Sequence, residues 1–365
     1  FFFDFHQFSV LIYLFFNARI RQLYKYICTL LHRRMLMKPT IVDIAKELNL
    51  SPSTVSRALK NNPRISIQTK NKVIQTAKKM NYLHEEDISI CNRIILIIIA
   101  NPQKSVENDE FFSVFLQGAL EGAKKESLHC LIQSIRSKES YKRALLPVSK
   151  VNGIILCGIP MPEELISFIK KLDIPCVQIG NYKGLEAFTS INNDNHRGGQ
   201  LVGKAVLDKG YKNISIITGS LSLKTFKDRL DGFISVVQND ETVSYTVYEC
   251  SDFDEKSGYG KTMELYKNST LKEKHCIFCT TDWLAKGALN SLEEMKVAVP
   301  ESTGVIGYGN LSFSSYLKPP LTTVALNPYL LGRLGITMLN EKMDCNPNLS
   351  STVFIEPIIT LRQSL

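Results

Sequence analysis

Residues 40–59 are Thr-Ile-Val-Asp-Ile-Ala-Lys-Glu-Leu-Asn-Leu-Ser-Pro-Ser-Thr-Val-Ser-Arg-Ala-Leu, and this stretch contains two short apolar patterns with helical spacing. The first pattern consists of Ile41, Ile44, Ala45 and Leu48. The second pattern begins after Ser51, which can cap a helix, and Pro52, which fits a first helical turn because no backbone donor is needed there. The stretch therefore predicts two short helices joined by a tight turn.

A third helix is expected directly after this pair. Asn61-Asn62-Pro63 ends the second helix near Leu59, and Ser66 can cap a helix that runs from Ile67 to Asn81. Two short helices braced by a third form the helix-turn-helix arrangement, in which the second helix enters the major groove of DNA. The small helical domain is expected over residues 37–84.

The polar side chains of the second helix are those that a groove would meet. Arg57 can form two hydrogen bonds with guanine, Ser53 can donate to a base edge or phosphate, and Lys60 can bring positive charge to phosphate. Polar helix faces are also common on helices that contact only water. The pattern alone leaves both interpretations open.

Positive charge is concentrated around these helices. The 365-residue chain has a formal net charge of +9, and residues 37–84 hold nine Lys or Arg against Asp43 and Glu47. Residues 85–365 are slightly acidic. A basic module attached to such a body is typical of proteins that bind a polyanion, so we expect double-stranded DNA as the partner.

A family resemblance is carried by residues 40–46 and 50–59, by Ile65-Ser66 and by Asn81-Tyr82. These segments resemble the LacI/GalR family of transcriptional repressors almost position by position. The resemblance implies that Pro52, Ser53 and Arg57 meet base edges, while Thr54, Ser56 and Asn61 lie near the DNA backbone. The candidate DNA-contacting residues are Thr40, Ser51, Pro52, Ser53, Thr54, Ser56, Arg57, Lys60 and Asn61.

Residues 85–92 depart from the family pattern. Relatives have Arg-Pro-Asn, then Ala-Arg and a leucine that enters the minor groove, whereas this chain has Leu-His-Glu-Glu-Asp-Ile over residues 83–88. Three consecutive acidic side chains would be repelled by phosphate. We therefore expect a shortened, atypical hinge with weak or absent insertion into the minor groove.

From Arg93 onward, apolar strands alternate with amphipathic helices. The expected strands are Ile94–Ala100, Leu128–Gln133, Gly153–Cys157, Cys176–Ile179, Ile214–Thr218, Cys276–Cys279 and Gly304–Gly307. Such alternation predicts an α/β fold with parallel sheets covered by helices. Residues 93–365 are long for one sheet, which favours two lobes with a ligand cleft between them.

The family resemblance continues through residues 93–365. It implies a two-lobed domain like that of periplasmic sugar-binding proteins, which senses a ligand and forms a homodimer. Arg229 aligns with the family arginine that holds effector hydroxyl or carboxylate groups, and Phe253 falls where an aromatic ring often stacks on the ligand. A surface ion pair for Arg229 and a core position for Phe253 are the alternatives. The candidate effector-binding residues are Phe111, Phe112, Asp194, Arg229, Phe253, Thr281, Asp282 and Asn310.

Two cleft positions differ from the sugar-binding pattern. Thr281 precedes Asp282 where many relatives have Asn-Asp, and Gly309-Asn310 replaces an aspartate that would accept hydrogen bonds from sugar hydroxyls. Asp282 or Asn310 could take over that role. We expect a small polar effector, such as a sugar or sugar derivative.

The segment at residues 1–36 is expected to be non-native upstream sequence or a disordered extension, with translation starting at Met35 or Met37. Its apolar run, residues 8–16, is shorter than the roughly 20 residues that a bilayer requires. A membrane-tethered regulator is the alternative. Nine cysteines scattered through apolar runs indicate reduced thiols in a cytoplasmic protein. Cys276 and Cys279 would point to opposite faces of one strand, so no metal site is predicted.

An enzyme and an exported solute-binding protein are the two other classes of protein that the sequence could suggest. An enzyme has little support, because residues 258–262 resemble the end of a phosphate-binding loop but Glu255 occupies the position of the required earlier glycine. No histidine has a catalytic or metal-ligand partner at motif spacing, and no cofactor is expected. An exported solute-binding protein would share the lobes, but a helix-turn-helix has no role there. We therefore predict a cytoplasmic, homodimeric DNA-binding regulator, with repression as the expected mode.

Overall fold

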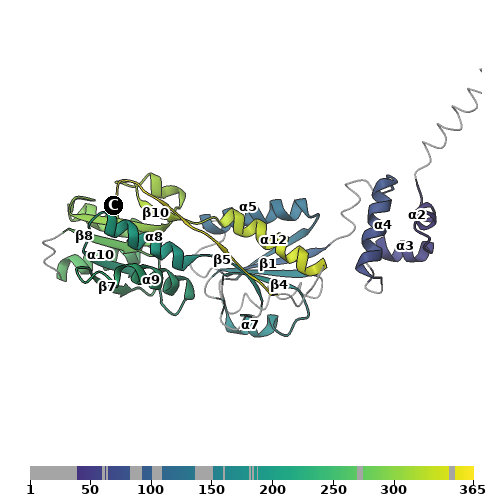
Figure 1. Ribbon diagram of the computed structural model, residues 1–365, viewed down its shortest axis with the longest axis horizontal. Coiled ribbons are helices and arrows are strands. Elements are labelled where there is room, and N and C mark those ends of the chain that lie inside the picture. The colour runs from purple at the N-terminus through teal and green to yellow at the C-terminus, as the bar shows by residue number, and fades with distance from the viewer. Residues whose placement is uncertain are drawn as a thin grey trace, which may run out of the picture. The chain divides into compact units, whose positions relative to one another are not determined.

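The computed structural model describes residues 39–59, 62, 65–82, 93–100, 109–135, 151–158, 161–180, 182, 185–186, 188–268, 274–344 and 350–365. The chain divides between Asn92 and Arg93 into two compact units, which we call the helical unit and the two-lobed unit (Figure 1). The predictions for residues 1–36, for the hinge at residues 85–92, and for Lys60 and Asn61 lie outside the described residues.

The helical unit contains the expected helices. They are α2 (Ile41–Glu47), α3 (Pro52–Leu59) and α4 (Ile67–Lys79). Their shared core is formed by six fully buried or nearly fully buried side chains, namely Ile44, Ala45, Val55, Ala58, Val73 and Ala77. All three helices contribute to this core, so the polar face of α3 is turned away from α2 and α4.

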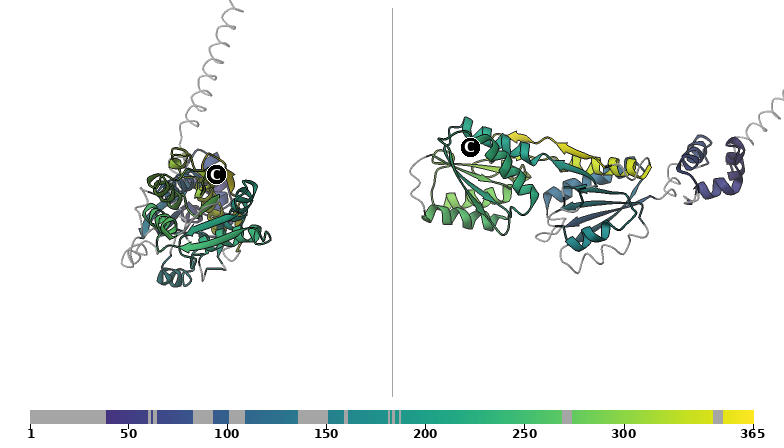
Figure 2. Two further views of the ribbon diagram at one scale, coloured as in Figure 1. Left: turned by 90° about the vertical axis from the view of Figure 1, so that its left-hand side faces the viewer. Right: turned by 60° about the horizontal axis from the view of Figure 1, so that its bottom comes forward.

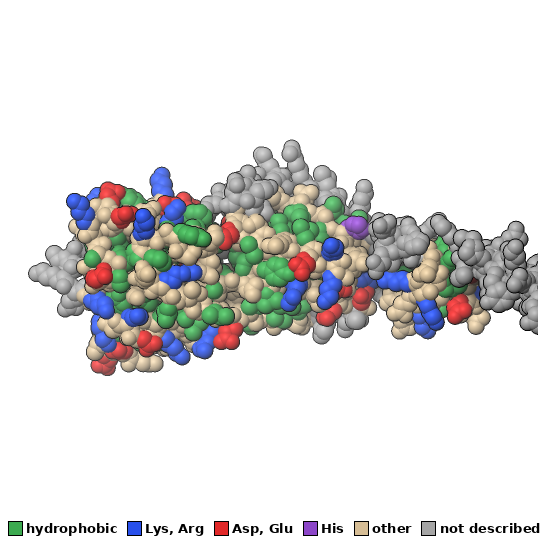
Figure 3. Space-filling view, turned by 90° about the horizontal axis from the view of Figure 1, so that it is seen from above, with side chains coloured by type: hydrophobic (Ala, Val, Ile, Leu, Met, Phe, Trp, Pro, Cys, Tyr) green, Lys and Arg blue, Asp and Glu red, His purple; other side chains and the backbone are tan. Residues whose placement is uncertain are grey.

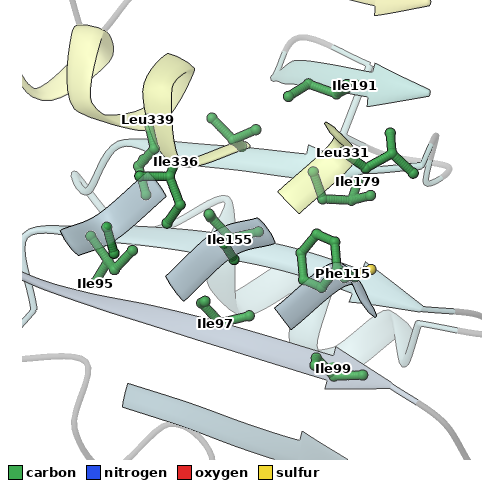
Figure 4. Close-up of a cluster of buried hydrophobic side chains, with 14 of the residues drawn as sticks. Ile95, Ile97, Ile99, Phe115, Ile155, Ile179, Ile191, Leu331, Ile336 and Leu339 are labelled. Atoms are coloured by element: carbon green, nitrogen blue, oxygen red, sulfur yellow. The ribbon is translucent and has the colours of Figure 1, made fainter. Parts of the chain in front are cut away.

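The first lobe of the two-lobed unit is a six-stranded parallel sheet with strand order β11-β5-β4-β3-β1-β2. Its strands are β1 (Ile94–Ala100), β2 (His129–Ile135), β3 (Gly153–Gly158), β4 (Cys176–Ile179), β5 (Thr189–Asn193) and β11 (Thr352–Ile355). Helices α5 (Glu110–Lys125) and α12 (Pro328–Asp344) cover one face, where Phe115 and Ile336 pack on Ile97 and Ile155 (Figure 4). Helix α7 (Glu163–Ile169) covers the opposite face.

The second lobe repeats this plan with strand order β12-β10-β9-β8-β6-β7. Its strands are β6 (Asn213–Thr218), β7 (Ser244–Glu249), β8 (His275–Cys279), β9 (Thr303–Gly309), β10 (Thr322–Ala325) and β12 (Ile358–Thr360). Helices α8 (Asn195–Asp208) and α9 (Lys224–Val237) cover one face, and α10 (Glu255–Asn268) and α11 (Asp282–Glu294) cover the other. Only the β10–β12 pair is antiparallel among the strand pairs of the described residues.

The chain crosses between the lobes at three places, and the right-hand view of Figure 2 shows the yellow C-terminal strands running between them. The first crossover lies at Asp194, between β5 and α8. The second lies between β10 and α12. The third joins β11 to β12.

The predicted fold class is confirmed, and each expected strand is present. The sequence missed β5, β7, β10, β11 and β12. Polar residues interrupt β5 and β10, while β7, β11 and β12 lie at sheet edges with much of their length exposed, so these strands lack a continuous apolar pattern.

Paired glycines explain how closely the covering helices approach one another. A Cβ on Gly199 of α8 would lie 2.1 Å from the Arg229 carbonyl oxygen, and a Cβ on Gly232 of α9 would lie 2.0 Å from the His196 carbonyl oxygen. These helices can touch backbone to backbone only because both positions lack a side chain. Arg229 is thereby held against the first turn of α8.

Charge is distributed differently in the two units. On the face of the two-lobed unit shown in Figure 3, Lys and Arg side chains are interspersed with Asp and Glu. The described part of the helical unit instead carries six basic residues against Asp43 and Glu47, and these are Lys46, Arg57, Lys70, Lys72, Lys78 and Lys79. Excess positive charge therefore belongs to the helical unit.

No described helix is long and apolar enough to cross a membrane. In the same part of the chain, no group of three or more His, Cys, Asp or Glu is arranged to hold a metal ion. Cys276 and Cys279 lie in the cores on opposite faces of the second sheet, as their spacing on a strand predicts.

Candidate functional site

The start of the helical unit is fixed by a capping box at α2. The Asp43 backbone N–H donates to Thr40 Oγ1 at 3.4 Å, and the Thr40 backbone N–H donates to Asp43 Oδ2 at 2.8 Å. The hydrogen bonds from Thr40 lower the pKa of the Asp43 carboxyl group. Thr40, a predicted DNA contact, therefore also has a structural role as the residue that caps the amino end of α2.

The turn between α2 and α3 is built from two local devices. Asn49 has φ 51°, the left-handed conformation that asparagine tolerates better than most residues. Ser51 then caps α3, because its Oγ accepts a hydrogen bond from the Thr54 backbone N–H at 3.1 Å. Together they set the direction in which α3 leaves the turn.

Helix α3 has one buried and one exposed side. Val55 and Ala58 are fully buried in the shared core. Pro52, Ser53 and Arg57 are exposed, and Ser53 and Arg57 lie four residues apart on the same side of the helix. The remaining described candidates fall around this face, with Ser51 exposed and Thr54 and Ser56 half-buried. The helix thus presents a hydroxyl, a guanidinium group and a proline to its surroundings.

The second candidate site is a cavity of about 500 Å³ between the two lobes. It lies at the carboxyl ends of strands from both sheets. Gly158 is the last residue of β3, Gly180 directly follows β4, and Gly309 is the last residue of β9. Ligands of open α/β sheets bind at such edges. The volume falls within the roughly 300–1,000 Å³ typical of small-molecule sites.

Aromatic rings from both lobes form part of the wall. Phe111 and Phe112, at the start of α5, lie edge to face with ring centres 5.4 Å apart. From the second lobe, Phe253 packs on Phe226 with ring centres 5.2 Å apart. Phe253 therefore fits both earlier interpretations, since it is packed against the core and also lines the cavity.

Arg229 lies in the cavity wall and is 6 % exposed, which excludes the surface ion pair. Its Nε donates to Asn195 Oδ1 at 2.9 Å and its Nη1 donates to the Thr280 carbonyl oxygen at 2.5 Å. The guanidinium carbon lies 3.8 Å from the centre of the Tyr308 ring. Burial lowers the pKa of Arg229 and raises that of Tyr308 to about 12. These contacts fix the orientation of the guanidinium group at the cavity wall.

Asp282 is fully buried, and its carboxylate binds protein groups. Oδ1 accepts from Thr323 Oγ1 at 2.5 Å, and Oδ2 accepts from the Leu311 backbone N–H and from Ser314 Oγ, both at 2.8 Å. Burial raises the pKa of the Asp282 carboxyl group. Although Asp282 lines the cavity, these three bonds occupy the oxygens that the sequence analysis offered to a ligand.

The prediction for Asn310 needs correction. Asn310 is not among the residues that line the cavity, and its Oδ1 accepts a hydrogen bond from Arg362 Nη2 at 2.7 Å. The preceding residue, Gly309, has φ +143°, and a Cβ there would lie 3.3 Å from Asp282 Oδ2. An aspartate at position 309 would be strained in this backbone, so the chain has glycine there.

The remaining predicted effector residues, Asp194 and Thr281, line the cavity as helix caps. Asp194 Oδ1 accepts from the Arg197 backbone N–H at 2.8 Å, and Thr281 Oγ1 accepts from the Leu284 backbone N–H at 3.1 Å. Both side chains lie at the amino ends of helices that point at the cavity.

Several lining residues were not among the predicted candidates. They include Asn193, Asn195, Lys224, Phe226, Trp283 and Tyr308. Asn193 Oδ1 is buried and has no hydrogen-bond partner in the described part of the chain, so it can accept from a ligand. Their positions in the fold could have identified two of them, because Asn193 ends a parallel strand and Lys224 begins a helix, and ligands of α/β sheets bind at the carboxyl ends of strands.

A helix-turn-helix unit followed by a two-lobed unit with a cavity between its lobes defines the class of ligand-responsive DNA-binding regulators. Comparison with known proteins agrees with this class. Residues 40–85 match the family model for bacterial regulatory proteins of the lacI family, and residues 204–365 match that for the periplasmic binding protein-like domain. The chain therefore combines a lacI-family DNA-binding domain with a periplasmic binding protein-like domain, and it is a DNA-binding transcriptional regulator.

Individual relatives are similar over nearly the whole chain. The HTH-type transcriptional repressor PurR of Mannheimia succiniciproducens is 25% identical over 341 residues, covering 89% of this chain and 98% of the relative. Catabolite control protein A of Staphylococcus epidermidis is 27% identical over 324 residues, covering 86% and 96%. The structure of the transcriptional regulator CelR in complex with cellobiose has a TM-score of 0.68 and 21% identity, and the match covers 90% of this chain and 100% of that one.

Proposed function

We propose that the chain is a homodimeric repressor that places α3 of each subunit in the major groove of a near-palindromic operator. The observation that carries this proposal is the exposed side of α3, where Ser53 and Arg57 lie together on a rigid, capped helix. A two-fold dimer would match the symmetry of such an operator, with half-sites about one helical turn apart or a multiple of that.

We further propose that a small polar molecule bound between the lobes controls operator binding. Arg229 and Asn193 supply polar groups to the cavity, while Phe111, Phe112 and Phe253 supply apolar surface. A sugar or sugar derivative has hydroxyl groups for the former and C–H faces for the latter. Coupling between the two sites would be reciprocal and is typically worth about 1–3 kcal/mol.

Genome-wide selection of DNA fragments by the purified protein tests the operator proposal. We expect a near-palindromic motif, and we expect Arg57→Ala to weaken the preference at one position in each half-site. Lys46→Ala is the matched control, because it removes one exposed positive charge from α2 and leaves α3 unchanged. Salt-sensitive binding without any sequence preference would contradict the proposal.

The effector proposal can be tested through Trp283, which is the only tryptophan in the chain and lines the cavity. Titration with monosaccharides and with disaccharides, beginning with cellobiose, should change its fluorescence for one compound class. An Arg229→Gln variant that remains folded should lose that response. A response that persists unchanged in Arg229→Gln would place the ligand elsewhere.

A further inference from the structure

A hydrogen-bonded contact joins the two lobes beside the cavity. Glu110 is the first residue of α5 in the first lobe, and Ser312 is the first residue of η4 (Ser312–Ser315) in the second lobe. The Ser312 backbone N–H lies 2.8 Å from Glu110 Oε1 and 2.9 Å from Oε2, and Ser312 Oγ donates to Oε2 at 2.8 Å. One carboxylate thus accepts hydrogen bonds from both the backbone N–H and the hydroxyl group of a residue 202 positions away.

This contact lies next to the residues that form the cavity wall. Phe111 follows Glu110, Leu311 precedes Ser312, and both Phe111 and Leu311 line the cavity. Separation of Glu110 from Ser312 would therefore move two parts of the wall apart.

The second-lobe half of the contact is held rigidly. The Leu311 backbone N–H and Ser314 Oγ both donate to the buried carboxylate of Asp282, so hydrogen bonds fix η4 on either side of Ser312. Phe313, between them, packs on Trp283 with ring centres 4.7 Å apart. The bonds to Asp282 are buried or half-buried, whereas those between Glu110 and Ser312 are exposed to solvent.

We infer that Glu110 and Ser312 form a latch that holds the two lobes together at the cavity, with Asp282 as the anchor that keeps η4 in place. Exposed hydrogen bonds exchange readily with water, so the latch can open while the buried anchor stays intact. Hydrogen bonds also fail within about one ångström of separation, so the latch distinguishes joined from separated lobes. The inference rests on the proposed function in one respect, namely that the cavity is the effector site. A ligand between the lobes would then bind more tightly when the latch is closed.

The latch can be tested without an effector or DNA, using acrylamide quenching of Trp283 in the full chain. Lobe separation would admit water to the cavity, so Glu110→Gln should raise the quenching constant and shift the emission maximum to longer wavelength. Ser312→Ala should do the same to a smaller extent, because it keeps the backbone N–H. The double variant should differ from Glu110→Gln by less than the sum of the two single effects, since both changes remove parts of one contact.

Glu121→Gln is the matched control. Glu121 lies on the same helix, α5, but accepts a hydrogen bond from Tyr329 Oη at 2.6 Å within the first lobe. Its quenching constant should equal that of the unchanged protein, and circular dichroism should show all variants folded. If Glu110→Gln does not fold, Ser312→Ala carries the test by itself.

Unchanged quenching in the folded latch variants, or an equal rise in Glu121→Gln, would overturn the inference. Loss of operator selection with the expected quenching results would instead count against the proposed function alone.

Discussion

His275 provides a quantitative test of how the second lobe is packed. It begins β8, is 4 % exposed, and its Nε2 lies 3.1 Å from Ser215 Oγ. Its Nδ1 has no hydrogen-bond partner among the described residues. Burial without an acidic partner disfavours the charged ring and lowers the pKa of His275 from 6.5 to about 4.

The pH dependence that follows has a definite sign. Between pH 4 and 6.5 the unfolded chain binds a proton at this position that the folded chain does not bind, so the free energy of unfolding rises with pH over this window. Above the unfolded pKa both states are neutral and the contribution is constant. At roughly 1.4 kcal/mol for each unit of pKa difference, the total gain is about 3 kcal/mol.

Urea unfolding of the protein and of His275→Gln, at several pH values from about 4.5 to 7.5, measures this contribution. The difference in unfolding free energy between the two proteins should grow with pH and level off near pH 6.5. His129→Gln, which removes an exposed histidine from β2, is the matched control. A difference that is independent of pH would refute the reasoning, because it would show that His275 titrates alike in both states.

Three further predictions concern packing and capping. Gly199→Ala should lower the free energy of unfolding by several kcal/mol in thermal unfolding and displace Arg229, because the added Cβ would lie 2.1 Å from the Arg229 carbonyl oxygen. Gly260 of α10 has open space around it, so Gly260→Ala should instead stabilise the protein by about 1 kcal/mol. Ser51→Ala should destabilise the helical unit by about 1 kcal/mol through loss of the α3 cap, measured by hydrogen exchange of its amides, and unchanged protection would contradict this role. Asp282→Ala should lower the melting temperature more than Asp282→Asn, because alanine leaves three buried or half-buried donors without an acceptor, and equal melting temperatures would contradict it.

The helical unit was predictable from sequence because its determinants are local. The apolar spacing, the cap at Ser51 and the turn at Asn49 all lie within 20 residues and act on adjacent backbone. The buried central strands were predictable for a similar reason, since strands covered on both faces are continuously apolar.

The cavity was only partly predictable, because its geometry depends on contacts between distant residues. The sequence suggested Asn310 as a ligand-binding residue, but the orientation of its side chain is set by Arg362, 52 positions later. Asp282 was correctly placed at the cavity, yet nothing local indicated that Thr323 and Ser314 would occupy its oxygens. The contact between Glu110 and Ser312 likewise has no local signal in the sequence.

The central claim is that Arg57 of α3 recognises bases in the operator, and Arg57→Lys tests it most directly. This variant keeps the positive charge but loses the two-pronged guanidinium geometry. Fluorescence anisotropy would compare binding to the selected operator duplex and to a scrambled duplex at two salt concentrations. Affinity for the operator should fall by about 1–3 kcal/mol, roughly 5- to 150-fold, because the base contact is lost. Affinity for the scrambled duplex, and its salt dependence, should stay the same. Equal losses on both duplexes, or no loss on either, would contradict base recognition by α3.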